Sequence, residues 1–198
     1  MRRSESKTRG RLPAMWRRAQ DERGSQLAEL AISLPLLVVF VVGIFDFSNA
    51  YNLRQKLTTA ADEGAIAAAA MPTNDLDQTS SNGPPSVRTA ADVAFNYLIN
   101  ENVLPLATQG GCVLPTNISP AGLTWKYVLS DCPGTLTIVV NRGIILSPPA
   151  TAPKVVGTQV SLSYTYQWQF NRVISLLSAQ NYNLPGTIGA SGNAENLF

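Results

Sequence analysis

A basic leader followed by an apolar run without charges restricts where most of this chain can lie. The run is residues 30–45, LAISLPLLVVFVVGIF. Residues 1–24 hold eight Lys or Arg against three acids, a net charge of +5, whereas residues 25–198 have a net charge of −3. Cations beside a membrane span stay on the cytoplasmic side. The order therefore predicts a single-pass membrane protein with a cytoplasmic N-terminus and an extracytoplasmic C-terminal part.

The basic leader could in principle bind nucleic acid instead. No interleaved basic and aromatic residues follow it, so we expect no nucleic-acid partner. The leader lacks an apolar period, and we expect it to be disordered.

The membrane span is expected to belong to a longer helix. Residues 30–45 would rise about 24 Å as a helix, which is less than the ~30 Å of a hydrocarbon core. Extension to 25–47 supplies the length but brings Glu29 inside the membrane edge, where a lone carboxylate is costly and indicates a function. Residues 46–70 contain no proline and many helix formers, so one helix should continue to Pro72. Pro35 should bend it.

The chain is expected to have five parts. They are a cytoplasmic basic leader over 1–24, a transmembrane helix over 25–47 and an extracytoplasmic continuation of that helix over 48–71. An α+β head follows over 72–179, and a flexible tail over 180–198.

The head is expected to combine a second helix with a sheet. Ser86 should cap a helix over residues 87–102, whose apolar residues recur at helical spacing. Alternating apolar residues predict strands over 123–129, 135–146 and 159–170. The fold class is therefore α+β and pilin-like, with an antiparallel sheet of about three strands. Residues 170–179 could form a short helix, which we expect to cap the sheet rather than lie on the membrane surface.

Two cysteines, Cys112 and Cys132, both follow the membrane span. An even pair outside the cytoplasm favours a disulfide, which would close a loop of about twenty residues and contribute about 3 kcal/mol. Two buried free thiols are the alternative, and a two-cysteine metal site fits less well without histidine.

The sequence contains no constellation typical of catalysis. It has no histidine, and therefore lacks the commonest general base and metal ligand. Phosphate-binding glycine loops and nucleophile elbows are also missing. Acidic residues such as Asp62, Glu63, Asp75 and Asp92 are expected to lie on solvated surfaces. We therefore expect no enzymatic activity, no cofactor and no metal.

The segment around Gly24 and Glu29 carries a different chemistry. Glycine lets an extended backbone lie close inside a protease cleft. Cleavage between Gly24 and Ser25 would remove the basic leader and create an α-amine whose pKa is near 8. Glu29, one helical turn further on, could pair with that amine in its own chain or in a neighbour, which would fix the register of adjacent helices. Glu29 could also be an incidental residue at the membrane boundary.

Residues 23–70 resemble the N-terminal region of the TadE-like family, the pilin-like components of tight-adherence (Flp-type) pilus systems in bacteria. The resemblance begins with GSQLAE before the apolar run and continues through GIFDFSNAYNLRQKLTTAADEGAIAAAA after it. The residues that fill the family pattern are Gly24, Glu29, Pro35, Gly43, Asp46, Ala60, Ala61, Glu63, Gly64, Ala65 and Ala69.

The resemblance implies cleavage after Gly24 by a prepilin peptidase. It also implies assembly in the bacterial inner membrane with other pilins or pseudopilins and with the inner-membrane pilus assembly platform. Leu30 follows Glu29, so the Glu-Tyr pair of the major Flp pilins is missing. The chain is longer than a major Flp subunit and shorter than TadG-type relatives with an added adhesive domain. A minor pseudopilin is therefore the expected role.

Two other functions compete with this hypothesis. One is an uncleaved single-pass binding or adhesion module that recognises a ligand through exposed Trp125, Tyr127 or Trp168. The other is a secreted protein cleaved by signal peptidase near residues 48–50, where small residues have the required spacing.

Overall fold

The computed structural model describes residues 22–76, 82–105, 112–116, 118, 120–146, 154–170, 172 and 186–197. The chain divides into two compact units, Met1–Ile44 and Phe45–Phe198. Residues 1–21 of the leader and most of the short helix expected over 170–179 lie outside the described residues, whereas the last three residues of the leader belong to the first helix.

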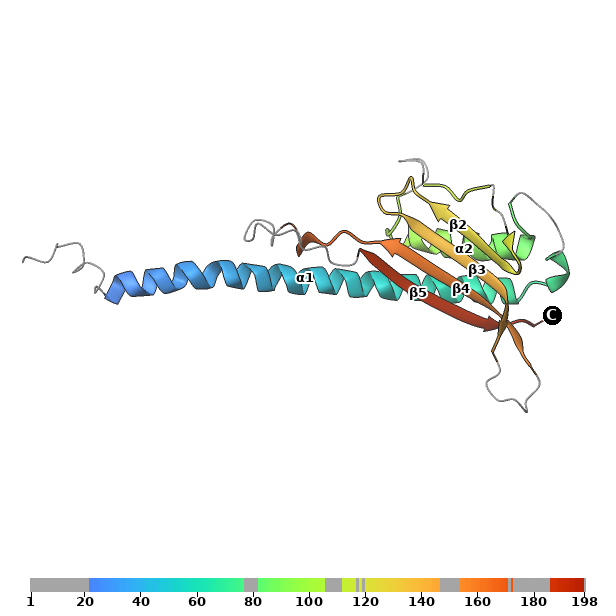
Figure 1. The fold of residues 1–198 in the computed structure, drawn as a ribbon, viewed down its shortest axis with the longest axis horizontal. Helices are drawn as coiled ribbons and strands as arrows, with labels where there is room; N and C mark the ends of the chain where they lie inside the picture. The colour runs from blue at the N-terminus through green and yellow to red at the C-terminus, as the bar shows by residue number, and fades with distance from the viewer. Residues whose placement is uncertain are drawn as a thin grey trace, which may run out of the picture. The chain divides into compact units, whose positions relative to one another are not determined.

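Helix α1 spans Glu22–Ala69, 48 residues, and continues through Pro35 (Figure 1). Its stretch Gly24–Ala69 is long and apolar enough to cross a membrane. Residues 24–38 are exposed on every side of the helix, although most of them are apolar. A helix that is apolar all round is typical of a membrane span. These features are consistent with a single-pass membrane protein.

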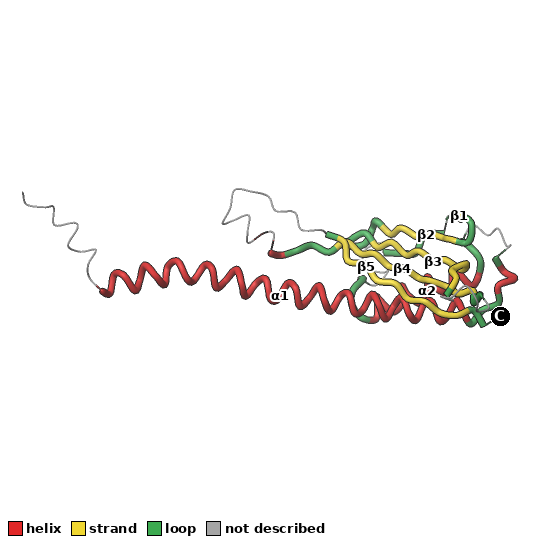
Figure 2. The backbone as a smooth tube through the Cα atoms, turned by 60° about the horizontal axis from the view of Figure 1, so that its bottom comes forward, coloured by secondary structure: helices red, strands yellow, loops and turns green. Residues whose placement is uncertain are grey.

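The second unit has an α+β fold, as the sequence predicts. A 3₁₀ helix, η2 (Thr73–Asp75), leads to α2 (Pro85–Asn100). The strands β1 (Pro120–Ala121), β2 (Thr124–Leu129), β3 (Leu136–Ile145), β4 (Val156–Thr165) and β5 (Thr187–Glu195) follow. They form an antiparallel meander in the order β1-β2-β3-β4-β5 (Figure 2).

The expected number of about three strands is wrong, because the described residues form five. The largest difference is β5, which lies in the segment expected to be a flexible tail. Its nine residues pair with β4 along the whole strand, from Thr187 opposite Thr165 to Glu195 opposite Gly157. Backbone pairing rather than side-chain alternation makes this segment a strand, since its sequence TIGASGNAE has few strand-forming side chains.

The alternation predicted for 159–170 is confirmed only up to Thr165. Val160, Leu162 and Tyr164 are buried along β4, as their period of two requires. The chain leaves the sheet at Tyr166, so Trp168 and Phe170 do not belong to the strand.

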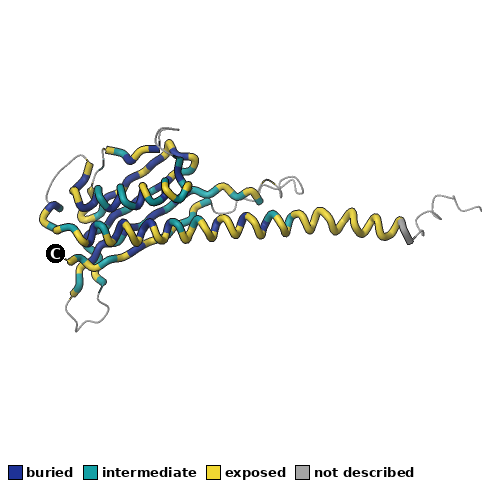
Figure 3. Tube along the Cα trace, turned by 180° about the vertical axis from the view of Figure 1, so that it is seen from behind, coloured by how far each residue is buried: buried dark blue, intermediate teal, exposed yellow. Residues whose placement is uncertain are grey.

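Both helices of the second unit cover one face of the sheet (Figure 3). The core lies between the helices and the inward face of β2, β3 and β4. One side of α1, formed mostly by alanines, is buried there, whereas Tyr51 is exposed and Leu53 is partly buried. The buried members are Leu57, Ala60, Ala61, Ala65, Ala68 and Ala69.

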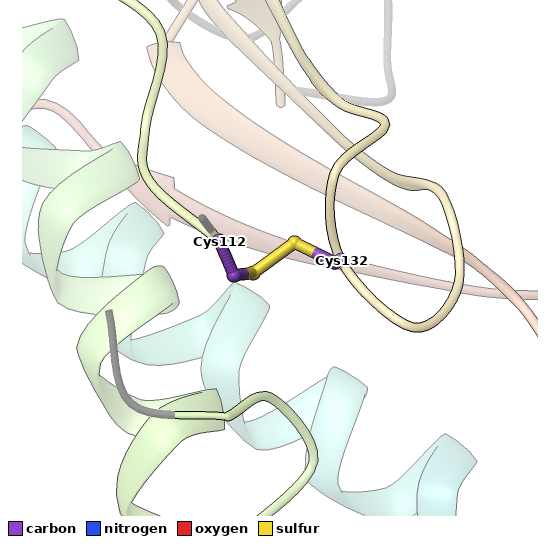
Figure 4. Close-up of a disulfide and its surroundings, with 2 residues drawn as sticks. All are labelled: Cys112 and Cys132. Carbon is purple, nitrogen blue, oxygen red and sulfur yellow. A yellow bond between two sulfur atoms is a disulfide. The ribbon is translucent and has the colours of Figure 1, made fainter. Parts of the chain in front are cut away.

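The predicted disulfide joins Cys112, in the segment after α2, to Cys132, in the turn between β2 and β3 (Figure 4). Both cysteines are buried in the core. The bond therefore fixes the segment after α2 against the sheet.

Candidate functional site

The first turns of α1 hold the residues expected to be processed and to direct assembly. Ser25 and Glu29 lie four residues apart in one helix, and both are exposed. Residues with this spacing are neighbours on a helix surface. A Cβ added at Gly24 would meet nothing within 4 Å. Packing against the residues that the structure describes therefore gives no reason for glycine at this position.

The two following motif residues, Pro35 and Gly43, also lie within α1. The helix continues through Pro35, which cannot donate the usual hydrogen bond to the carbonyl of Ala31. Gly43 is buried.

Asp46 has a role that the sequence did not reveal. Its side chain is only 2% exposed. One carboxylate oxygen accepts a hydrogen bond of 2.7 Å from the Tyr166 hydroxyl, and the other accepts one of 2.9 Å from the backbone N–H of Phe170. Burial, together with the hydrogen bond and the charge of Asp46, raises the pKa of Tyr166 to about 12. Asp46 thus holds the segment after β4 against α1.

Glu63 and Gly64 lie side by side in α1 but do different things. Glu63 is exposed, as expected of a solvated acid. A Cβ added at Gly64 would come within 2.9 Å of the Ala90 carbonyl oxygen and 3.3 Å of the Ala94 Cβ. Gly64 therefore allows α1 and α2 to approach each other closely.

Arg142 caps the C-terminal end of α1. The residue is 1% exposed and lies in β3. Its guanidinium donates hydrogen bonds to the Ala68 carbonyl, to the Met71 carbonyl at 3.1 Å and to the Thr158 hydroxyl at 3.0 Å. A cation at this end complements the helix dipole. Burial lowers the pKa of Arg142, and the charge of Asp75 opposes that shift.

Two expectations for the start of α2 are wrong. Ser86 does not cap the helix, because it lies inside the first turn and Pro84 occupies the cap position. Asp75 is not solvated, since it is 6% exposed. Its carboxylate accepts hydrogen bonds from the Ser86 backbone N–H at 2.6 Å and from the Ser86 hydroxyl at 3.1 Å. A carboxylate from outside the helix therefore satisfies a free N–H of its first turn.

The aromatic residues considered for ligand binding separate into two groups. Trp125 and Tyr127 are 3% and 0% exposed, so they belong to the core and cannot bind a ligand at the surface. Trp168 is half-buried. A groove of about 760 Å³ lies elsewhere on the second unit, and its lining is rich in amides and tyrosines. Its residues include Asn49, Asn52, Lys56, Tyr97, Tyr164 and Gln167.

Among the described residues, no group of three or more Cys, Asp or Glu side chains is arranged to hold a metal ion. The buried polar residues instead hold neighbouring elements together through hydrogen bonds. Two of them had a sequence signal: Arg142 is a lone base within an apolar strand, and Asp46 is the first charge after the apolar run.

Comparison of the chain with known protein families shows which residues carry the family pattern. Residues 24–65 match the model of the TadE-like protein family. No curated protein and no solved structure matches the chain. The resemblance found in the sequence is thereby confirmed from Gly24 to Ala65, a stretch that holds every residue of the family pattern named above except Ala69.

The TadE-like match suggests involvement in a Tad pilus system. It covers both the exposed apolar part of α1 and the part that packs in the second unit. Membrane association with pilus components fits this match together with the candidate membrane helix.

Proposed function

We propose that this chain is a minor pseudopilin-like subunit of a tight-adherence pilus system. It is anchored in the bacterial inner membrane by α1, with its N-terminus in the cytoplasm and its second unit outside. A prepilin peptidase cleaves it after Gly24, and α1 then assembles with other pilins or pseudopilins on the inner-membrane assembly platform.

The observation that carries this proposal is the contrast between the two halves of the TadE-like segment. In the second unit, Asp46 and Gly64 have structural tasks, because each fixes α1 against another element. Gly24, Ser25 and Glu29 are exposed, and the described structure gives them no such task. Residues without a packing role that nevertheless fill a family pattern support a role in processing and assembly.

Glu29 is the residue through which assembly can be tested. An unpaired carboxylate at the membrane edge is costly, and the cationic α-amine of a cleaved neighbour would offset that cost. We expect Glu29→Gln to leave membrane insertion intact and to reduce copurification of partner pilins at least about tenfold, the equivalent of ~1.4 kcal/mol.

The matched control is Asp62→Asn, which neutralises an exposed carboxylate of the same helix outside the family pattern. This variant should retain its partners. If Glu29→Gln copurified as much partner as the unaltered chain, Glu29 would have no assembly role.

We further propose that the chain is not an enzyme, which the absence of histidine supports. An uncleaved binding or adhesion module is the second candidate function, and the amide-rich groove favours it. Two of the three aromatic residues first considered for that function lie in the core. The two functions differ in processing, because only the pseudopilin requires cleavage after Gly24.

A further inference from the structure

The burial of Asp46 removes a charge from the surface of α1 at the end of the apolar run. On an isolated helix this carboxylate would be exposed. Here it is 2% exposed and accepts hydrogen bonds from Tyr166 and Phe170. The next charged residue along α1 is Arg54, which is exposed.

The exposed surface of α1 is therefore free of charge from Leu30 to Leu53. As helix, residues 30–53 rise about 36 Å, compared with about 24 Å for 30–45. A hydrocarbon core is about 30 Å thick, and the headgroup regions extend it to about 40–45 Å. Residues just beyond Asp46 therefore reach the level of the lipid headgroups.

An aromatic surface lies at this level. Phe47 and Tyr51 are 63% and 62% exposed on α1. The Phe47 ring makes an edge contact with the Trp168 ring at a centroid distance of 5.4 Å, and Trp168 makes another with Tyr166 at 5.0 Å. Phe47, Tyr51 and Trp168 line a shallow groove of about 340 Å³ together with Arg54.

Lipid headgroups fit the chemistry of this surface. Trp and Tyr are enriched at membrane interfaces because their rings have an apolar body and a polar edge. An arginine beside them can lay its stem on apolar surface while its guanidinium reaches a phosphate. Phe47 and Tyr51 also come directly after the apolar run of residues 30–45 along the same helix.

We propose that the segment 166–170, fastened by Asp46 and joined by Phe47 and Tyr51, docks the head domain onto the phospholipid headgroup layer. The head thus contacts the membrane through its own chain as well as through the span. This inference depends on α1 crossing the membrane, and it does not depend on the pilus role.

Fluorescence quenching by lipids tests this contact. The full chain is placed in nanodiscs, one copy each, of phosphatidylglycerol and phosphatidylcholine carrying a spin label near the headgroup. Trp16→Phe is the background, so that Trp125 and Trp168 are the remaining tryptophans. We expect spin-labelled lipid to quench this variant at least about twice as much as the variant that also carries Trp168→Phe.

Further variants separate the surface from the core. Trp16→Phe with Trp125→Phe should retain the quenching, because Trp125 is buried. Should that variant not fold, the comparison with and without Trp168→Phe decides alone. Asp46→Ala should lower lipid quenching of Trp168 by half or more and raise its quenching by aqueous iodide, whereas Glu63→Ala should change neither.

Two results would overturn the proposal. One is equal lipid quenching with and without Trp168, which would mean that the segment faces water. The other is a Trp168 that lipid does not quench in single-copy nanodiscs but that becomes shielded from iodide in assembled fibres. The occupant of the surface would then be another protein.

Discussion

Buried polar residues fasten helix α1 to the rest of the second unit. Asp46 holds the segment after β4, and Arg142 binds the carbonyls at the end of the helix. The Thr158 hydroxyl accepts a hydrogen bond from Arg142 and donates one of 2.6 Å to the Asn196 side chain. The backbone N–H of Leu197 donates to the Ala69 carbonyl at 3.1 Å. The end of α1 is therefore held by β3, β4 and the residues after β5.

Arg142→Ala should strongly destabilise the second unit. The change leaves buried carbonyls without a donor and creates a cavity in the core. We expect the free energy of unfolding to fall by about 3 kcal/mol or more. Thermal unfolding followed by circular dichroism in detergent micelles would measure it. Lys126→Ala, which removes an exposed cation from β2, should change stability by less than about 0.5 kcal/mol.

Tyr127 should make stability depend on alkaline pH. Burial raises its pKa from 10.0 to about 12, the nearby charge of Arg88 opposes this shift, and Asp92 adds to it. The folded state therefore favours the neutral phenol. This contribution is fully present below about pH 10 and is lost as pH rises toward 12.

Unfolding temperatures between pH 9 and pH 12 would measure this dependence. The unaltered chain should lose stability over this range more steeply than Tyr127→Phe, which has no phenol to ionise. Tyr51→Phe alters an exposed tyrosine and should keep the steep loss. Equal slopes for Tyr127→Phe and the unaltered chain would refute the role of Tyr127.

Among the elements, the contact between α1 and α2 depends on small residues. Gly64 faces the Ala90 carbonyl, and a side chain there would meet backbone rather than a movable group. Lys56 adds a polar link, since its ammonium donates to the Glu101 carbonyl at 2.7 Å and lies 3.3 Å from the Glu101 carboxylate. The two helices are thus joined by close packing at Gly64 and by polar contacts at Lys56.

Gly64→Val should force α1 and α2 apart. We expect it to lower the free energy of unfolding by about 2 kcal/mol, because overpacking in a close contact moves the backbone. Thr58→Val is the matched control, since it places the same residue at an exposed position of α1. A comparable loss in both variants would show that helix propensity, not packing, causes the effect.

The sequence predicted the helices and strands whose apolar side chains recur at regular spacing. It missed strands that depend on packing against other elements. Helix α1, helix α2 and the cores of β2, β3 and β4 follow from apolar spacing. Strand β5 does not, because a Cβ at Gly192 would lie 2.5 Å from backbone atoms of Ala61 and Asp62. Close packing on α1 requires a residue without a side chain at this position. Because glycine is unfavourable in strands, strand propensity does not predict β5.

The residues of the candidate site also differ in whether the sequence alone could identify them. Gly24, Ser25 and Glu29 could be proposed from spacing, because their chemistry lies within one turn of helix. Asp46 and Asp75 could not, since their partners are 120 and 11 residues away in the sequence. Only the fold brings Tyr166 to Asp46 and Ser86 to Asp75.

For the whole molecule, the central claim is that the chain is processed like a pilin. The apolar half of α1 would then begin with a free amine at Ser25, one turn before Glu29. The buried half of the same helix would carry the α+β head outside the membrane. Uncleaved anchoring would leave the basic leader attached, and cleavage by signal peptidase would remove the span itself.

N-terminal sequencing of the protein extracted from bacterial membranes distinguishes these outcomes most directly. We expect a sequence that starts at Ser25 in the unaltered protein and at Met1 in Gly24→Val, whose branched side chain would not fit where a bare backbone must enter the peptidase. A start at Met1 in the unaltered protein, or near Tyr51, would contradict processing after Gly24.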